Sequence, residues 1–485
     1  MNLVTEEFLR RVTRIPHHGL GLSVDVYTPD LFELVEALER NGLDYGYLEI
    51  FKAAPAALES VRRRLPAAWL AYHAEGLWVT QPDPERLSPF HAELDETAEQ
   101  LRILDSHWLN HECAAKQMAG YSFGTYLPAL FTEASAEVTA ANIAQAQQRL
   151  DRSIAARGGM GPLFLLETPP LTYVGFGDLG LADFFRLVTE RTPCGVVLDI
   201  GHLWTVYRYT GAWRRRPLTS FLAELLDAFP LERVVEIHLA GLAPHERVHA
   251  EARAAGEPPL WIDAHGAPIP EVLTDMLAQV LEHRGLAHLK GVALEVDTKP
   301  IPMIVEEFEQ ARARFGHRIA RLDARDSREK RDSIRASRAR PARRACGAPD
   351  AGRLAEQYDR YARIVTGRAT QGVPVLGQDA SALALYVEQY LPHEILEWGG
   401  AVREIFPETC RSLERAGITL DEFVRFWFRE PRETDQAYDF FLLKITRFVE
   451  FVREVLPEAV ETVQRDAQVL RDGYRAANEI VGATS

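Results

Sequence analysis

Cysteine is scarce in this chain of 485 residues, which contains only Cys113, Cys194, Cys346 and Cys410. These four lie far apart and form no CxxC pair, so we expect neither a thiolate zinc site nor a framework of disulfides. Any metal site in this protein would therefore use nitrogen and oxygen ligands.

Long hydrophobic runs are missing too. No stretch approaches the length of apolar residues that a bilayer requires. The amino-terminal "MNLVTEEFLRRVTR" contains acids and lacks the apolar core of a signal peptide. The formal net charge of -15 argues against a broad nucleic-acid-binding face. We therefore expect a cytoplasmic protein that binds neither a membrane nor nucleic acid.

The amino-terminal part has a repeating pattern. Over roughly the first 300 residues, short apolar runs alternate with longer amphipathic segments, as in β-α units around a parallel sheet. The expected strands begin near Gly19, Tyr45, Ala67, His107, Pro162, Cys194, Arg233 and Gly291. Eight such units close a (β/α)8 TIM barrel, an α/β fold that we predict for residues 1–317.

The composition changes after the barrel. Residues 318–350, with "RIARLDARDSREKRDSIRASRARPARR", are dense in arginine and poor in large apolar residues, which predicts a basic linker. Residues 351–485 carry apolar stripes at helical spacing, as in "AYDFFLLKITRFVEFVREVL". We predict a smaller all-helical domain there, because a chain of this length exceeds what one core usually organises.

The predicted strand ends carry many chemically active side chains. They are His73, Asn110, His111, Glu112, Glu167, Asp199, His202, His238 and Glu295, with Asp263 and His265 on a connection. A single buried histidine is more often a core residue bonded to the backbone. Several carboxylates meeting at one barrel mouth would repel one another, however, and bound cations relieve that repulsion. The joint pattern therefore predicts a metal centre.

The ligand types favour iron, manganese or a multinuclear zinc cluster over a single structural zinc. Because carboxylates bridge ions, about nine ligands imply roughly two or three metals. Sugar isomerases or epimerases and endonuclease IV-like hydrolases share such a barrel and remain alternatives. The acidic charge disfavours the nuclease. No strand-end lysine suited to aldose isomerisation is evident except Lys52.

The same residues lie in motifs whose order resembles a known family. The motifs include "YLEIF", "LAYHAEGL", "LNHE", "LLETPPLTYVGF", "CGVVLDIGHLW", "RVVEIHLAG", "WIDAHGAPIP" and "ALEVDTKPIP". From residue 15 to about residue 310, the chain resembles the multinuclear non-heme iron-dependent oxidases, the DUF692 family. The resemblance implies a TIM barrel with about two or three irons, mixed Fe(II) and Fe(III), and dioxygen as co-substrate. It also implies oxidation of a ribosomally made precursor peptide, commonly at cysteine.

Carried over by position, the resemblance gives a set of metal ligands or their immediate neighbours. They are His73, Asn110, Glu112, Glu167, Asp199, His202, His238, Asp263, His265 and Glu295. Within this set, the predicted catalytic residues are His73, Glu167, Asp199 and His238.

Two positions depart from the family pattern. Phe51 in "LEIFKAA" stands where the family has a histidine, and Asn110 aligns with an expected carboxylate. On a strand, Glu112 faces the same way as Asn110, so Glu112 is a candidate substitute. His17 and His18 are candidates for the missing imidazole. A peptide-binding scaffold with a degraded metal site is therefore a further alternative.

The helical part carries a second resemblance. The segment "ILEWGGAVREIFPETCRSLERAGITLDEFVRFWF" resembles the partner proteins often encoded beside these oxidases. Such partners help to present the precursor peptide, so the resemblance implies a leader-binding role for this fused domain. The alternative is a generic helical packing domain.

Overall fold

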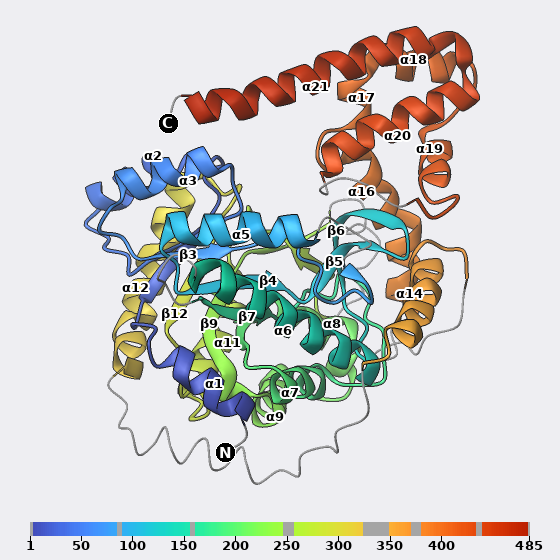
Figure 1. Ribbon diagram of the computed structural model, residues 1–485. Coiled ribbons are helices and arrows are strands. Elements are labelled where there is room, and N and C mark those ends of the chain that lie inside the picture. Colours follow the sequence, from blue (N-terminus) through green and yellow to red (C-terminus); the bar gives the residue numbers. More distant parts are fainter. Residues whose placement is uncertain are drawn as a thin grey trace.

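The structure is a computed structural model that describes residues 3–84, 90–155, 161–245, 257–323, 349–369, 380–432 and 439–483. Eight parallel strands close into a barrel in the order β1-β12-β9-β8-β7-β4-β3-β2 (Figure 1). Their bounds are β1 Gly19–Val24, β2 Leu48–Phe51, β3 Leu70–His73, β4 Trp108–Glu112, β7 Leu163–Glu167, β8 Gly195–Asp199, β9 Val234–Leu239 and β12 Gly291–Glu295. Each strand overlaps a segment that the sequence predicts as a strand, so the α/β TIM-barrel fold is confirmed.

Amphipathic helices surround the barrel (Figure 1). They are α2 Leu31–Arg40, α3 Pro55–Arg64, α5 Phe90–Leu104, α6 Glu133–Ala155, α7 Leu181–Arg191, α8 Ile200–Tyr209, α9 Leu218–Ala228, α11 Glu271–Glu282 and α12 Ile301–Asp323, with short 3-10 turns η1 Ala212–Arg214 and η2 Leu231–Arg233. Their apolar faces pack on the outward-facing strand residues and form the main core. This core holds the barrel rigid around whatever its interior contains.

The barrel interior changes character along its axis. At the amino-terminal end of the strands, Phe8 and Val12 of α1 (Leu3–Val12) pack with Trp108 and Leu165 in a separate apolar core. Toward the carboxyl-terminal end, the inward-facing positions become carboxylates, imidazoles and an amide, such as Glu167. Because neighbouring strand residues face opposite sides, this polar layer follows from the alternation of residue types along each strand.

Two hairpins extend the barrel at its carboxyl-terminal end, and the sequence analysis did not predict either. One consists of β5 Ala114–Met118 and β6 Tyr121–Pro128, and the other of β10 Leu242–Pro244 and β11 Trp261–Asp263. The second hairpin places Asp263 at the end of a strand. Its cue in the sequence is weak because β10 and β11 have three residues each.

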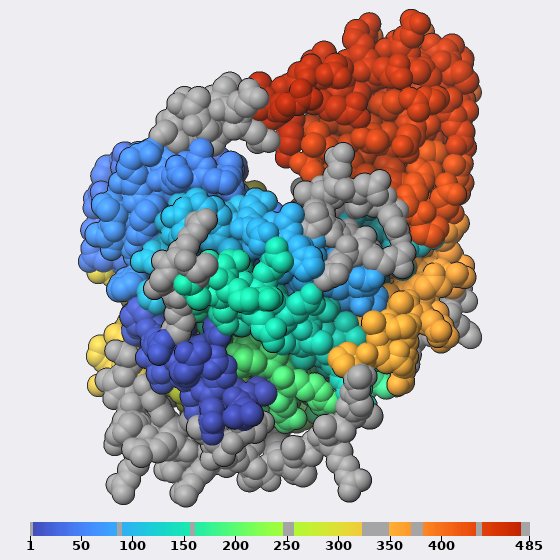
Figure 2. Space-filling model, in the orientation of Figure 1, coloured from blue at the N-terminus to red at the C-terminus, as the bar shows by residue number. Residues whose placement is uncertain are grey.

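All regular elements among the described residues from 349 onward are helices. They are α14 Ala351–Val365, α15 Ala380–Leu385, the π-helical turn η3 Tyr386–Tyr390, α16 Leu391–Glu397, α17 Val402–Ile405, α18 Pro407–Arg415, α19 Leu420–Trp427, α20 Phe440–Val455, the 3-10 turn η4 Pro457–Ala459 and α21 Val460–Ala483. Figure 2 shows this helical region, in orange and red, against one side of the barrel and projecting beyond it. Its buried apolar residues join the main core of the barrel without a break.

The predicted basic linker needs one correction. Residues 318–323 continue helix α12, because Ile319 and Leu322 keep the apolar stripe that packs α12 against the barrel. The rest of the predicted linker up to residue 348 lies outside the described residues, and so does Cys346. The described cysteines are Cys113, Cys194 and Cys410, which are buried and free.

Candidate metal centre

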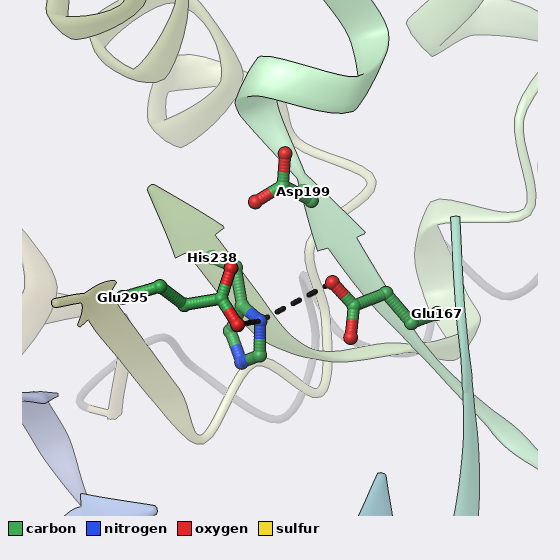
Figure 3. A group of neighbouring side chains, drawn as sticks. All are labelled: Glu167, Asp199, His238 and Glu295. Atoms are coloured by element: carbon green, nitrogen blue, oxygen red, sulfur yellow. Dashed lines mark ion pairs between the residues drawn. The ribbon is translucent and has the colours of Figure 1, made fainter. Parts of the chain in front are cut away.

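Four buried side chains from four different strands meet at the carboxyl-terminal end of the barrel (Figure 3). This central group consists of Glu167, Asp199, His238 and Glu295, and one ligand atom from each lies within 4.8 Å of the others. The Nδ1 atom of His238 lies 3.3 Å from Glu167 Oε1 and 3.2 Å from Glu295 Oε1. Three carboxylates around one imidazole form a ligand set suited to a divalent cation.

A first flank of the cluster lies beside Glu167 and consists of His73, Asn110 and Glu112. His73 Nε2 is 3.5 Å from Glu167 Oε2, and Asn110 Nδ2 donates a hydrogen bond to the same oxygen at 2.6 Å. Glu112 forms a second compact group with Glu167 and His202. Asn110 and Glu112 thus both face the interior, as strand alternation predicts.

His111 lies between Asn110 and Glu112 on β4 and faces away from the cluster. Its Nε2 accepts a hydrogen bond from the backbone N–H of Leu77 at 3.2 Å. Burial lowers the pKa of His111 to about 4, so this ring is neutral. His111 is therefore a core histidine bonded to the backbone.

A second flank consists of His202, Asp263 and His265. Asp263 Oδ2 lies 3.4 Å from His202 Nε2 and 3.1 Å from His265 Nε2. His265 Nε2 is also 3.5 Å from Glu295 Oε2, which links this flank to the central group. The structure therefore brings all ten predicted ligand residues into one cluster, and their role as ligands stays a prediction.

The position of His202 has a local cause. Asp199 is the N-cap residue of α8, and its side chain accepts a hydrogen bond from the backbone N–H of His202 at 2.6 Å. A capping carboxylate satisfies a free donor in the first turn of a helix. The Asp-x-x-His spacing therefore puts a carboxylate at the strand end and an imidazole one helical turn later.

Three histidines of the flanks share an orientation typical of metal ligands. The Nδ1 atom of His202 lies 2.5 Å from the carbonyl oxygen of Thr168, and Nδ1 of His265 bonds to Asp297. The Nδ1 atom of His73 lies 3.2 Å from the carbonyl oxygen of Ala74. A carbonyl or carboxylate accepts only from N–H, so each Nδ1 carries the proton. Each Nε2 faces a carboxylate of the cluster and would give its lone pair to a bound cation, as in carboxylate–histidine–metal arrangements.

Two further glutamates lie beneath the central group, and the sequence analysis missed them. Glu49 and Glu236 form a third compact group with His238. Ser23 Oγ donates to Glu49 Oε1 at 2.9 Å, and the hydroxyl of Tyr47 donates to Glu236 Oε1 at 2.5 Å. A signal existed, because Glu236 stands two residues before His238 and therefore faces the same side of its strand.

The two departures from the family pattern have different outcomes. Phe51 does lie at the mouth, where its ring centroid is 4.7 Å from that of His73, so an apolar ring occupies this position. The prediction that His17 or His18 supplies the missing imidazole is wrong. His18 precedes β1 at the amino-terminal end of the barrel, and its ring packs 4.4 Å from Trp108. Because parallel strands share a direction, this end lies opposite the cluster.

Proton binding shows how strongly the cluster attracts positive charge. Burial is the main cause that raises the pKa of Asp199 to about 7, and the negative charges of Glu295 and Glu167 add to it. Burial opposes a charge on His73, but contact with Glu167 and the nearby carboxylates raise its pKa to about 9. Without a cation, the cluster thus holds protons at neutral pH.

Several buried oxygens of the cluster have no hydrogen-bond partner. They are Asn110 Oδ1, Glu112 Oε2, Asp199 Oδ2 and Asp263 Oδ1. A buried polar atom without a partner is costly, and a bound cation would satisfy it. The donor set and these oxygens therefore fit metal ions.

TIM-barrel enzymes carry their active sites at the carboxyl-terminal end of the strands. This chain has a buried cluster of imidazoles and carboxylates at that end, which defines a barrel enzyme that could hold metal ions. Residues 46–315 match the family model described as the RiPP precursor modification enzyme MbnB/TglH/ChrH. This segment is more than half of the chain, so the chain belongs to this family of enzymes. In the described parts of the chain, none of the helices is long and apolar enough to cross a membrane.

Individual relatives agree with the family match. A UPF0276 protein of Caulobacter vibrioides (strain NA1000 / CB15N) is 29% identical over 274 residues, which cover 56% of this chain and 85% of the relative. A UPF0276 protein of Bordetella pertussis is 30% identical over 285 residues, which cover 55% and 82%. Endonuclease IV from Thermus thermophilus has a TM-score of 0.38 and 16% identity over 62% of this chain and 99% of that chain. A structural similarity at that level carries no argument about function.

Proposed function

We propose that this protein is a multinuclear iron oxidase that uses dioxygen to modify a ribosomally made precursor peptide. The observation that carries the proposal is the buried cluster of imidazoles and carboxylates, with unsatisfied oxygens, in a chain of this family. Iron itself, dioxygen and cysteine as the modified residue rest on the resemblance of the motifs to the multinuclear non-heme iron-dependent oxidases.

Different residues would have different roles in this reaction. The central group and the two flanks would hold the ions, with Glu167 shared, because its Oε1 faces His238 and its Oε2 faces His73. Bound iron would carry electrons from the peptide to dioxygen. Phe51 covers His73 with an apolar ring and keeps water away from that side. Asp297 and Glu49 would hold the protons on the outer nitrogens of His265 and His238.

We also propose that the helical region takes part in recognising the peptide. A groove of 620 Å³ lies among its helices and is lined by residues that include Arg368, Leu391, Val424, Arg425 and Phe428. The lining also includes Glu388 and Asp421, so the groove suits a peptide with apolar side chains and charges of both signs. We therefore propose a leader-binding role for this region in preference to a purely structural one.

The decisive test is metal analysis of protein purified without oxygen. We expect more than one iron per chain, with a Mössbauer spectrum of a multinuclear site. Stoichiometric zinc with no iron, retained under those conditions, would contradict the proposal and favour the hydrolase or isomerase alternatives. A chain that binds no metal at all would favour the peptide-binding scaffold.

A further inference from the structure

The helical region forms hydrogen bonds with the β5–β6 hairpin along its outer edge. Glu394 of α16 accepts hydrogen bonds from the backbone N–H and, at 2.9 Å, the hydroxyl of Thr125. Trp427 Nε1 donates to the carbonyl oxygen of Ser122 at 2.8 Å, and the backbone N–H of Arg432 donates to the carbonyl oxygen of Gly120 at 2.6 Å. These bonds occupy backbone groups of β6 and of the turn before it that would otherwise remain open at an edge.

The contact is tight as well as polar. A side chain at Gly124 would bring its Cβ within 2.8 Å of Phe440 and 2.9 Å of Glu394, so glycine allows the close approach. The rings of Phe123 and Phe428 lie 5.6 Å apart. An isolated two-stranded hairpin is marginally stable. The position of this hairpin therefore depends on the helical region.

The hairpin ladder is interrupted where it passes the barrel mouth. Ala115 pairs with Leu127 and Gln117 pairs with Ser122, so Lys116 alone stands opposite residues 123–126. Such bulges redirect side chains and are common beside active sites. Here Thr125 meets the helical region while the next residue, Tyr126, turns to the barrel.

On the barrel side, Tyr126 and Lys116 meet Glu75. The hydroxyl of Tyr126 donates to Glu75 Oε1 at 3.0 Å, and Lys116 Nζ lies 3.3 Å from the same oxygen and 4.4 Å from the centre of the Tyr126 ring. Glu75 follows the cluster residue His73 by two positions. The side chains of Lys116 and Glu75 are 20% and 47% exposed, so a molecule at the mouth can reach them.

The charges around these three residues select the kind of group that binds there. Burial raises the pKa of Asp25, and the negative charges of Asp297 and Glu75 raise it further, so both of these carboxylates lie near Asp25 at the mouth. The three carboxylates outnumber the ammonium of Lys116 and therefore disfavour a phosphate or a free carboxylate. A peptide group is neutral and offers both an N–H and a C=O, which match a carboxylate acceptor and an ammonium donor.

We propose that Lys116, Tyr126 and Glu75 form a rim that binds the peptide main chain beside the reacting residue, and that Glu394 is the residue that positions this rim. The inference rests on the proposed function and adds to it the part of the substrate that is held. It also makes the helical region a structural part of the barrel mouth.

The positioning role can be tested without substrate by hydrogen–deuterium exchange of the full chain. We expect Glu394→Ala to speed exchange of the amides in residues 121–128, and Glu394→Gln to restore protection, because its amide oxygen still accepts from Thr125. Glu404→Gln, an exposed residue of α17, is the matched control. Unchanged exchange in a folded Glu394→Ala protein would overturn the positioning role.

The contact with substrate can be tested with a library of acetylated and amidated decapeptides that carry one central cysteine. For the sequence that iron-loaded wild-type protein modifies best, we expect Lys116→Met to raise KM about tenfold with little change in kcat. N-methylation of the peptide bond beside cysteine should also raise the wild-type KM, because it removes the N–H from which Glu75 accepts a hydrogen bond. We expect Tyr126→Phe to act in the same direction.

The outcomes separate the two proposals. If wild-type protein modifies peptides and the KM of Lys116→Met equals that of wild type, the rim proposal is wrong and the oxidase function stands. If iron-loaded wild-type protein modifies none of the peptides, the proposed function fails and the rim proposal fails with it.

Discussion

Glu49 Oε1 lies 3.1 Å from Nε2 of His238, on the side of the imidazole opposite the central group. Ser23 Oγ holds the same carboxylate oxygen at 2.9 Å. With one proton of His238 kept on Nε2, its Nδ1 would offer a lone pair to a cation held by Glu167 and Glu295. His238 therefore presents Nδ1 to the cluster, whereas the histidines of the flanks present Nε2.

This relationship predicts that Glu49 controls metal affinity without touching the metal. We expect Glu49→Gln to weaken binding at the central group by about 10- to 100-fold, because the amide no longer fixes the proton on Nε2 as firmly. Anaerobic titration with Fe(II) measures the effect. Glu59→Gln, on the exposed face of α3, is the control. Equal affinities for all three proteins would contradict the role of Glu49.

A second prediction concerns the apolar ring at the mouth. Phe51 lies against His73, so Phe51→His would place a further imidazole beside the first flank. We expect tighter iron binding there and a higher iron content per chain, measured by elemental analysis after anaerobic purification. Phe51→Leu keeps the position apolar and should leave the iron content unchanged. An identical iron content in both variants would rule out this position as a ligand site.

Metal binding should compete with protons. In the metal-free chain, the pKa of Asp199 is about 7 and that of His73 is about 9, so both groups hold protons at neutral pH. A cation displaces those protons, and we therefore expect the affinity for Fe(II) to rise with pH from 7 to 9. Calorimetry in buffers of different ionisation enthalpy should show proton release. Binding that neither depends on pH nor releases protons would contradict this account.

The other end of the barrel predicts a stability effect. Burial lowers the pKa of His18 from 6.5 to about 4, so the folded chain holds this ring neutral. Between these two pH values the unfolded chain binds more protons at His18 than the folded chain does. The contribution of neutral His18 to the free energy of unfolding is therefore complete above pH 6.5 and is lost as the pH falls to about 4. The loss amounts to about 3 kcal/mol.

Urea unfolding of wild type and His18→Phe at several pH values measures this contribution. The free energy of unfolding should fall more steeply in wild type than in the variant as the pH drops from 6.5 to about 4. Parallel curves for the two proteins would show that His18 does not titrate in the way its burial implies.

The sequence by itself determined the barrel and most of the side chains that meet at its mouth. Strand alternation and helical spacing are local patterns, so they locate all eight strands and the inward-facing positions at their ends. The same alternation could have revealed Glu49 and Glu236. It also shows why Asn110 and Glu112, two residues apart, share the interior.

Only the tertiary structure decided which end of the barrel a residue faces and which distant segments meet. His18 lies near Gly19 in the chain, yet strand direction places it far from the cluster. Glu394 and Thr125 are separated by 269 positions, and no local pattern indicates their contact. Hydrogen bonds between distant residues produce no periodic pattern in a sequence. The rim at the mouth and its contacts with the helical region could therefore be found only from the tertiary structure.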